Sequence, residues 1–293
     1  MIRFVNLSRL PIEEMVDLWN RGFENYFANV QTTADRFLNR VAAEGLSLER
    51  SFAAFEDDRA IGFVVNGFRT RNGKTLAWNG GTAIVPDFRG QGYGKILMER
   101  NMALYEEAHV DEAWLEAVSQ NERAIRLYAS VGYETVDRLG NLQHTGALDI
   151  PAPAGYAFRR GLPDEVRDAA FDGGRSPWQT QAANMGKGEC VQVLQDDRLV
   201  GYALYKKAWD DDGRLSSIHL YQCEADPGRR DGRDILLAAL TQAFRPLELP
   251  CRRTVVHLRK SHELLWPLLA ELRFEQTVEQ VHMRKQMRRG FDG

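Results

Sequence analysis

The two halves of this chain carry the same pattern, so its fold must be one that can be built twice. An Asp-Asp-Arg turn before an apolar run, a proline after a strand-like stretch and a polar residue ahead of a helical pattern all recur 139 to 141 residues later. The matched segments are residues 57–63 and 196–202, Pro86 and Pro227, and residues 121–134 and 262–275. Matches at nearly one offset indicate that a whole domain is duplicated.

The length of the chain agrees with a duplication. A chain of 293 residues is long for one ordinary domain and sufficient for two, and its 44% hydrophobic content can fill two cores. Residues 151–155, Pro-Ala-Pro-Ala-Gly, have the composition of a linker. We therefore expect one domain over residues 1–150 and a second over residues 151–293.

A glycine-rich run in the first half carries the strongest chemical signal. Residues 85–95, Val-Pro-Asp-Phe-Arg-Gly-Gln-Gly-Tyr-Gly-Lys, lie between an apolar stretch at 82–85 and an amphipathic helical pattern. A strand therefore runs through a tight turn into a helix. The first N–H groups of a helix and the positive end of its dipole bind anions, and glycines let a phosphate approach. Arg89 and Lys95 add positive charge at the two ends of the turn.

Two common phosphate loops do not match this run. A dinucleotide fingerprint needs a third glycine where Lys95 stands, and a Walker loop needs glycine at Arg89 and Ser or Thr at Ile96. The remaining pattern, Arg-x-x-Gly-x-Gly after a strand, resembles the acyl-CoA pyrophosphate loop of the GNAT superfamily of N-acetyltransferases. For this loop taken alone, a turn without a ligand stays the alternative.

A second signature follows at the expected distance. Residues 115–118 predict a short strand, Asn121 is a good helix N-cap, and Gly132 is typical of a helix end. Between them, apolar residues recur at helical spacing: Ala124, Ile125, Leu127, Tyr128 and Val131. This order is similar to the strand, helix and strand that follow the pyrophosphate loop in GNAT enzymes.

The resemblance implies an α/β fold, with α+β character, in which helices cover both faces of a mixed sheet, and two GNAT-like domains in tandem. We expect helices near residues 11–21, 33–43 and 92–108, and strands near 133–138 and 142–148 that complete the first domain. It implies acetyl-CoA as co-substrate, bound by the first domain. The residues that the resemblance places against acetyl-CoA are Ile84, Val85, Arg89, Gly90, Gln91, Gly92, Tyr93, Gly94, Lys95 and Asn121.

Acetyl transfer needs an oxyanion donor, a proton donor for the departing thiolate and a route that deprotonates the amine. We expect the pantetheine arm to pair with residues 82–85, and the N–H group of Val85 to polarise the thioester carbonyl. By resemblance, Tyr128 is the proton donor. The strand before the loop contains no acid, so Glu116 is the candidate base, with a structural or acceptor-contacting role as the alternative. Glu24 and Tyr26 lie where the acceptor loop is expected, with an ordinary helix end as the alternative to substrate contact.

The second copy has lost these features. No loop glycine is kept in register within residues 227–234, and Asp231 and Asp234 stand where phosphate would bind, which is electrostatically unfavourable. Leu269 replaces Tyr128, and the copy is about fifteen residues shorter ahead of Asp196. We therefore predict that residues 151–293 are catalytically silent and stabilise the first domain, shape its acceptor cleft or form a dimer.

Composition limits the remaining possibilities. The net charge of −3 does not favour nucleic-acid binding, and neither a signal peptide nor a membrane-spanning run is recognised, so we expect no membrane partner. Three cysteines, Cys190, Cys223 and Cys251, have no metal or redox spacing, and the histidines form no ligand pattern. We therefore expect no metal, reduced thiols and a cytoplasmic location.

Three functions stay open on the sequence. The leading hypothesis is an acetyl-CoA-dependent N-acetyltransferase that acts on the amine of a small molecule, in a chain that can form a homodimer. The second is a Fem-type aminoacyl transferase, which the intact CoA loop and the lack of basic charge disfavour. The third is a non-catalytic acetyl-CoA-binding or regulatory protein, which the missing acid on the strand before the loop keeps open.

Overall fold

The computed structural model describes residues 1–151, 153–169 and 171–287, which form two compact units. Among the described residues, the first unit contains residues 1–136 and 281–287, and the second lies within Asp137–Gln280. The boundary between the units in the sequence thus comes before the predicted linker at residues 151–155, and residues 281–287 belong to the first unit. Both units have helices packed on a mixed sheet, in agreement with the predicted α/β fold.

The sheet of the first unit runs in the order β1, β2, β3, β4, β5 and then the last part of β12. Its strands are β1 (Ile2–Asn6), β2 (Leu46–Glu56), β3 (Arg59–Arg71), β4 (Lys74–Ile84) and β5 (Glu112–Val118). β1 to β4 are antiparallel neighbours, whereas β5 runs parallel to β4. This change of direction places the ends of β4 and β5 at the same edge.

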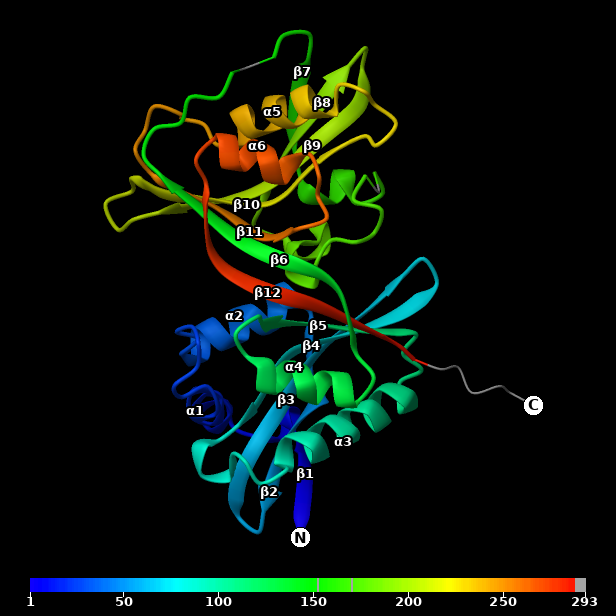
Figure 1. Cartoon of the computed structure of the whole chain (residues 1–293). Helices are drawn as coiled ribbons and strands as arrows, with labels where there is room; N and C mark the ends of the chain where they lie inside the picture. Colours follow the sequence, from blue (N-terminus) through cyan, green and yellow to red (C-terminus); the bar gives the residue numbers. More distant parts are fainter. Residues whose placement is uncertain (152, 170, 288–293) are drawn as a thin grey trace, which may run out of the picture. The chain divides into compact units, whose positions relative to one another are not determined.

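Four helices cover this sheet, with α1 and α2 on one face and α3 and α4 on the other (Figure 1). They are α1 (Ile12–Gly22), α2 (Ala34–Glu44), α3 (Tyr93–Glu107) and α4 (Glu122–Ser130). Thr33 caps α2 by accepting from the N–H group of Arg36, and Gly45 ends it with a φ of 64°. All four helices lie within a few residues of the predicted ranges.

The region after α4 differs from the prediction of two strands. One long strand, β6 (Glu134–Thr145), replaces both, because Gly140 serves a close approach rather than a turn. A Cβ atom at Gly140 would lie 2.4 Å from the ring of Trp266. β6 then pairs with β11 in the second unit.

The strand that completes the first unit comes instead from the C-terminal end of the described chain. β12 (Glu275–Gln286, red in Figure 1) begins in the second unit and enters the first at Val281. Within the first unit, the N–H group of Met287 donates to the carbonyl of Asp111 at 2.9 Å, and Nζ of Lys285 donates to the carbonyl of Val131 at 2.6 Å. These contacts hold the strand beside β5.

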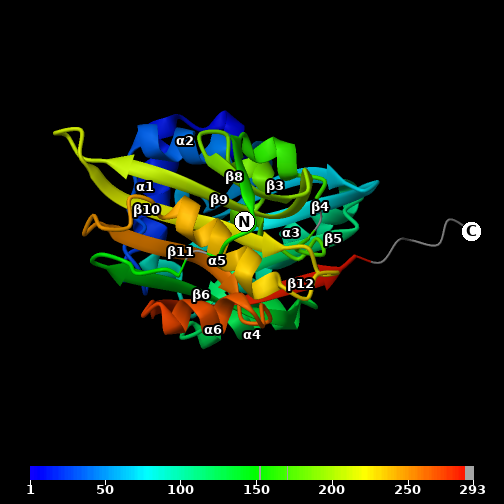
Figure 2. The ribbon, with the colours of Figure 1, turned by 90° about the horizontal axis from the view of Figure 1, so that it is seen from above.

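The second unit repeats this order of strands and helices. It contains β7 (Ala157–Gly161), β8 (Glu189–Gln195), β9 (Arg198–Trp209), β10 (Leu215–Ala225), α5 (Gly232–Ala243), β11 (Arg252–Arg259) and α6 (Leu265–Glu271). α5 packs on β9 and β10 (Figure 2). Short 3₁₀ helices at Pro163–Val166, Trp178–Thr180 and Ala182–Asn184 stand at the place in the order that α1 and α2 occupy in the first unit.

The repeated sequence segments adopt the same local structures in both units. The β2–β3 and β8–β9 turns each contain an aspartate with a positive φ, 53° at Asp57 and 49° at Asp196. Asn121 caps α4 by accepting from the N–H group of Ala124 at 3.2 Å, and Nδ1 of His262 accepts from the N–H group of Leu265 at 3.2 Å. The duplication seen in the sequence is therefore also a duplication of structure.

Candidate active site

A pocket of about 410 Å³ lies in the first unit where β4 ends. It is bounded by the end of α1 and the loop that follows, by the last residues of β4, by the glycine turn and by the start of α4. Its lining comprises residues 22–27, 82–84, 88–90 and 92–95, together with Asn121, Arg123, Ala124, Leu127 and Tyr128. Most of the residues predicted to bind acetyl-CoA therefore gather around one cavity.

Beside the β4 residues that line this pocket, β4 and β5 no longer pair, which leaves an opening between the two strands. The two strands pair in parallel as far as Asn79 and Leu115, and no further pair follows. At the same place β4 shifts its register with β3, between Asn79 and Gly81. Arg40 of α2 donates to the carbonyl of Gly80 at 2.7 Å, which satisfies a backbone group released by the bulge. The irregular strand thus separates from β5 and leaves backbone groups on this side of β4 available to a ligand.

The strand's alternation corrects the predicted oxyanion donor. The N–H group of Val85 donates to the carbonyl of Ile61 at 2.9 Å, so it faces β3 and belongs to the sheet. Successive residues of a strand point their backbone groups to opposite sides, so Ile84 faces the opening. In agreement, the Ile84 carbonyl accepts from Nε of Arg89 on that side at 2.9 Å. The N–H group of Ile84, rather than that of Val85, is therefore placed to meet a thioester carbonyl.

The glycine turn fits a diphosphate. Gly90 and Gly92 have φ values of 82° and 88°, and a Cβ atom at either would find no heavy atom within 4 Å, so the space beside them is open. α3 begins directly afterwards at Tyr93 and points its first N–H groups toward this space. Gly94 has another role, because its Cβ would lie 3.1 Å from Cδ2 of Leu127, so it lets α3 and α4 pack closely.

Arg89 does not extend toward this phosphate space. Besides Ile84, its guanidinium donates to the carbonyls of Gly22 and Glu24, each at 3.0 Å. It therefore fastens the loop after α1 to the end of β4. Of the other loop side chains, the Gln91 amide donates to the Asp87 carbonyl at 2.8 Å. The positive charge predicted for phosphate at Arg89 is instead used to hold the loop after α1.

Two further loop side chains complete the turn. The hydroxyl of Tyr93 donates to Glu56 at 2.8 Å, and Nζ of Lys95 lies 3.7 Å from Glu99 on the exposed side of α3. Lys95 lines the pocket with a side chain that is largely exposed, as does Arg123 of α4, so both can add positive charge there.

Tyr128 faces the pocket from α4 and is 8% exposed. Burial raises the pKa of its hydroxyl, and a hydrogen bond with Thr82 partly opposes this change. Tyr128 is therefore protonated at neutral pH and can donate to a thiolate. Tyr26 approaches from the loop after α1, where burial raises its pKa and the side chain of Asn121 hydrogen-bonds to it.

Glu116 lies at the same opening but on the other face of the sheet. Its neighbours Leu115 and Ala117 pack in the core that contains Tyr128, so Glu116 points to the face covered by α1 and α2. Its side chain is 4% exposed; Oε2 accepts from Nε1 of Trp78 at 2.7 Å, and Oε1 lies 3.6 Å from Nε2 of His282. Glu116 does not line the 410 Å³ pocket, so the structure separates it from the other predicted residues.

Residues 12–133 match the model of the Acetyltransferase (GNAT) family, and they span the glycine turn, the opening and Tyr128. This match lies within the first unit, which is called the GNAT unit below. Acetyl-CoA is the co-substrate of this family, as predicted. The space at Gly90 and Gly92 and the start of α3 are the parts of this GNAT unit that fit its diphosphate.

Curated relatives resemble the GNAT unit alone. The [ribosomal protein bS18]-alanine N-acetyltransferase of Escherichia coli is 31% identical over 96 residues, which are 29% of this chain and 62% of that protein. N-alpha-acetyltransferase 30 of Schizosaccharomyces pombe is 33% identical over 92 residues, 31% of this chain and 61% of that protein. The chain thus spans somewhat less than two thirds of either relative.

Solved structures resemble the whole chain. A GCN5-related N-acetyltransferase from Sphaerobacter thermophilus has a TM-score of 0.65 at 18% identity and covers 100% of this chain and 97% of its own. A tandem GNAT protein from the clavulanic acid biosynthesis pathway has a TM-score of 0.65 at 15% identity, with coverage of 99% and 100%. At these identities the likeness concerns the fold, and it confirms the predicted tandem GNAT architecture.

The prediction of a small-molecule amine as acceptor is wrong. Both curated relatives carry names that refer to amino groups of proteins, an alanine of a ribosomal protein in one and α-amino groups in the other. The sequence held no signal for the acceptor, and the small-molecule hypothesis rested on the absence of any other indication.

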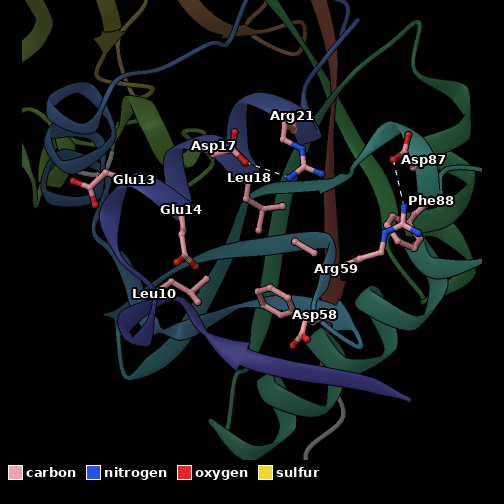
Figure 3. A pocket seen from close by; sticks show the side chains of 12 residues that line it. Leu10, Glu13, Glu14, Asp17, Leu18, Arg21, Asp58, Arg59, Asp87 and Phe88 are labelled. Atoms are coloured by element: carbon pink, nitrogen blue, oxygen red, sulfur yellow. Dashed lines mark hydrogen bonds and ion pairs between the residues drawn. The ribbon is translucent and has the colours of Figure 1, made fainter.

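A larger groove of about 570 Å³ lies on another side of the GNAT unit (Figure 3). It runs between α1 and the β2–β3 turn, and its charged side chains form the ion pairs Asp17–Arg21 at 3.3 Å and Arg59–Asp87 at 3.5 Å. It contains neither the glycine turn nor Tyr128. The larger groove is therefore not the one that gathers the residues predicted to bind acetyl-CoA.

At the matching loop of the second unit, a carboxylate is held by the protein itself. Arg229 donates to both oxygens of Asp231, at 2.8 and 2.6 Å, and the hydroxyl of Tyr156 donates at 2.8 Å. The hydrogen bonds from Arg229 lower the pKa of Asp231 to about 2. Because Asp231 directly precedes α5, a negative charge stands where an anion would bind.

In the second unit, buried side chains also fill the place by β10 and β11 that corresponds to the opening between β4 and β5. Glu224 lies 3.1 Å from Arg259 and 3.2 Å from His262, and all three side chains are almost fully buried. The cavity among them is about 20 Å³, enough for one water molecule. Among the described residues, no group could hold a metal ion, and no helix is long and apolar enough to cross a membrane.

Proposed function

We propose that the GNAT unit transfers the acetyl group of acetyl-CoA to an amine of a polypeptide, and that the N-terminal α-amine is its acceptor. The observation that carries this proposal is the opening between β4 and β5, which has Tyr128 on one face of the sheet and Glu116 on the other. A thioester in the opening can then be attacked from the Glu116 side. The choice of a polypeptide follows the acceptors named for both curated relatives.

Binding begins at the glycine turn in this account. The diphosphate meets the first N–H groups of α3 beside Gly90 and Gly92, and Lys95 adds positive charge. The amide-bearing pantetheine arm follows the free side of β4 as an added strand. The thioester carbonyl then reaches the N–H group of Ile84, which stabilises the negative charge that develops during attack.

The ammonium nitrogen loses two protons during acetylation, and the departing sulfur takes up one. An α-amine has a pKa of about 8, so much of it is an ammonium ion at neutral pH, and Glu116 or a water bound to it removes a proton before attack. Tyr128 donates to the sulfur as the carbon–sulfur bond breaks. A free thiol has a pKa of about 8.5, so even partial proton donation favours departure.

The loop after α1 forms the acceptor side. Phe23, Tyr26 and Phe27 line the pocket, and the side chain of Phe27 is 54% exposed, which is unusual for a large apolar residue. Arg89 holds this loop at Gly22 and Glu24, so the aromatic residues lie on a loop that is anchored to the end of β4. They offer apolar contact to the first side chains of a polypeptide whose amine points to the opening.

We infer that the second unit carries out no transfer. The internal pair of Arg229 and Asp231, the filled opening around Glu224 and the buried helix α5 support this inference. Leu269 also lacks the hydroxyl of Tyr128. A homodimer and a cytoplasmic location stay predictions.

Mass spectrometry of acetylated peptides tests the proposed function. The full chain is incubated with acetyl-CoA and a peptide library that has free α-amines and internal lysines, beside a panel of small amines. The account expects acetyl groups on α-amines, with at least tenfold weaker transfer by Tyr128→Phe. Acetylation confined to lysine side chains or to small amines would remove the proposed acceptor, and hydrolysis of acetyl-CoA without transfer would remove the transferase.

A further inference from the structure

The candidate base Glu116 is held from two sides. Nε1 of Trp78 donates to Oε2 at 2.7 Å, and Nε2 of His282 lies 3.6 Å from Oε1. The side chains of Glu116 and His282 are each only 4% exposed. A carboxylate removed from water to this degree is costly unless opposite charge or hydrogen bonds stabilise it. Trp78 supplies a neutral hydrogen bond, and His282 can also supply charge.

His282 comes from β12, beyond the segment that matches the GNAT family. Its neighbours Val281 and Met283 pack in the core that contains Tyr128, so His282 faces the Glu116 side of the sheet. Its ring lies 4.8 Å from the ring of Trp114 at an angle of 34°. Anchors from Lys285 to Val131 and from Met287 to Asp111 fix the strand on which it stands.

Other charged groups of the described residues near this face include Arg284, whose guanidinium lies 5.6 Å from the Trp114 ring, the pair Lys74–Glu112 at 2.7 Å, and the pair Arg40–Glu44 at 2.7 Å. Arg40 also lies 5.9 Å from the Trp78 ring. His282 lies 3.6 Å from Oε1 of Glu116 and is itself titratable, so it is placed to respond to the charge of Glu116.

We propose that His282 is a positioning residue for acetyl transfer, which holds Glu116 at the β4–β5 opening and takes over the proton that Glu116 removes from the amine. This inference rests on the proposed function. With the His282 ring neutral, one N–H bond of the ammonium breaks, an O–H bond forms on Glu116, and the proton then passes to Nε2 of His282 and to water. A second proton leaves the nitrogen as the amide forms and replaces the proton that Tyr128 gives to the sulfur, so one proton is released per ammonium acetylated. The active site of the GNAT unit is thus completed by β12, the last strand of the described residues.

The coupling of His282 to Glu116 can be measured without an acceptor. The ring nitrogens of histidine are labelled in the full chain, and the pKa of His282 is followed by NMR in the wild type and in Glu116→Gln. Loss of an opposite charge at this distance should lower the pKa of His282 by about one unit or more. The exposed His109 serves as internal control. An unchanged pKa of His282 would overturn the proposal.

Kinetics test the role in transfer. His282→Gln keeps a hydrogen-bonding side chain but cannot take up the proton, so kcat/KM should fall about tenfold or more and the acid limb of its pH profile should move to higher pH. The affinity for CoA should stay at the wild-type value. His219→Gln is the matched control, because His219 is hydrogen-bonded to Ser217 and Thr254 in the second unit.

The outcomes separate this proposal from the proposed function. A wild-type enzyme that acetylates peptides while His282→Gln keeps its rate and pH profile would overturn the role of His282 alone. A wild-type enzyme that acetylates no peptide would overturn the proposed function, and the NMR titration would still decide whether His282 responds to Glu116. Rescue of His282→Ala by free imidazole, with no effect on His219→Ala, would support the proton transfer.

Discussion

Replacing Gly94 with aspartate should weaken CoA binding without unfolding the GNAT unit. Gly94 is the second residue of α3, and its backbone lies at the anion-binding end of the helix. An acidic side chain in the first turn stabilises a helix by itself, so the helix should persist. The aspartate charge, placed about 4 Å from one negative charge of the diphosphate, raises the free energy of CoA binding by about 1 to 4 kcal/mol at dielectric constants of about 80 to 20.

These energies correspond to a loss of affinity between about fivefold and about 900-fold, and we expect at least tenfold. Gly94→Asn is the control, since it adds nearly the same bulk at the 3.1 Å contact with Leu127 but no charge. Isothermal titration of CoA into the wild type and both variants, with circular dichroism to verify folding, gives the comparison. Equal affinities for Gly94→Asp and Gly94→Asn would refute the assignment of the turn as a phosphate site.

Three further outcomes follow from the structure. Tyr128→Phe should lower kcat by about 10² to 10⁴ with an unchanged dissociation constant for CoA, and a variant that keeps more than about a tenth of the wild-type kcat would remove Tyr128 from the mechanism. Calorimetry should count one CoA per chain, whereas two equivalent sites would show that the second unit binds as well. Burial lowers the pKa of His257 to about 4 in the folded protein, so as pH falls the unfolded chain binds a proton at this residue before the folded protein does. The free energy of unfolding should therefore fall by up to about 3 kcal/mol as pH drops from about 6.5 to 4. Urea unfolding of His257→Asn, which suits the φ of 50° there, should show a weaker pH dependence, and an equal slope would contradict this origin.

The parts of the fold that the sequence predicted are those that local interactions determine. The turn at Gly90 and Gly92 needs positive φ values, and the cap at Asn121 needs a side chain that accepts from a nearby N–H group. Both requirements can be recognised from the residue types within a few positions of the sequence. The repeat was equally visible, because Asp57 and Asp196 adopt the same turn.

The parts that were missed depend on contacts between distant residues. Gly140 looked like a break between two strands, and only the ring of Trp266 explains why glycine is needed inside one strand. Nothing near His282 indicates that it will lie beside Glu116. The two residues lie far apart in the sequence, and no motif connects them. The return of β12 to the first unit depends instead on the packing of Val281 and Met283 in the core of that unit.

The site residues illustrate a second limit. Val85 and Ile84 are neighbours of similar character, and choosing the oxyanion donor required the phase of the strand, which the hydrogen bond from Val85 to Ile61 reveals. Arg89 was expected to bind phosphate because of its charge, but its guanidinium donates hydrogen bonds to three carbonyl groups instead. Charge and position in a motif predicted the pocket, but they did not predict the partner of each side chain.

A conjugate that joins the α-amine of a peptide to CoA through the acetyl group tests the central claim most directly. If the GNAT unit holds CoA and a polypeptide amine on the two sides of the β4–β5 opening, the conjugate gains contacts that neither half has alone. Calorimetry should then show one conjugate per chain, bound at least about 10²-fold more tightly than CoA, and Gly94→Asp should weaken it. A conjugate that binds no more tightly than CoA would contradict a polypeptide acceptor at this opening.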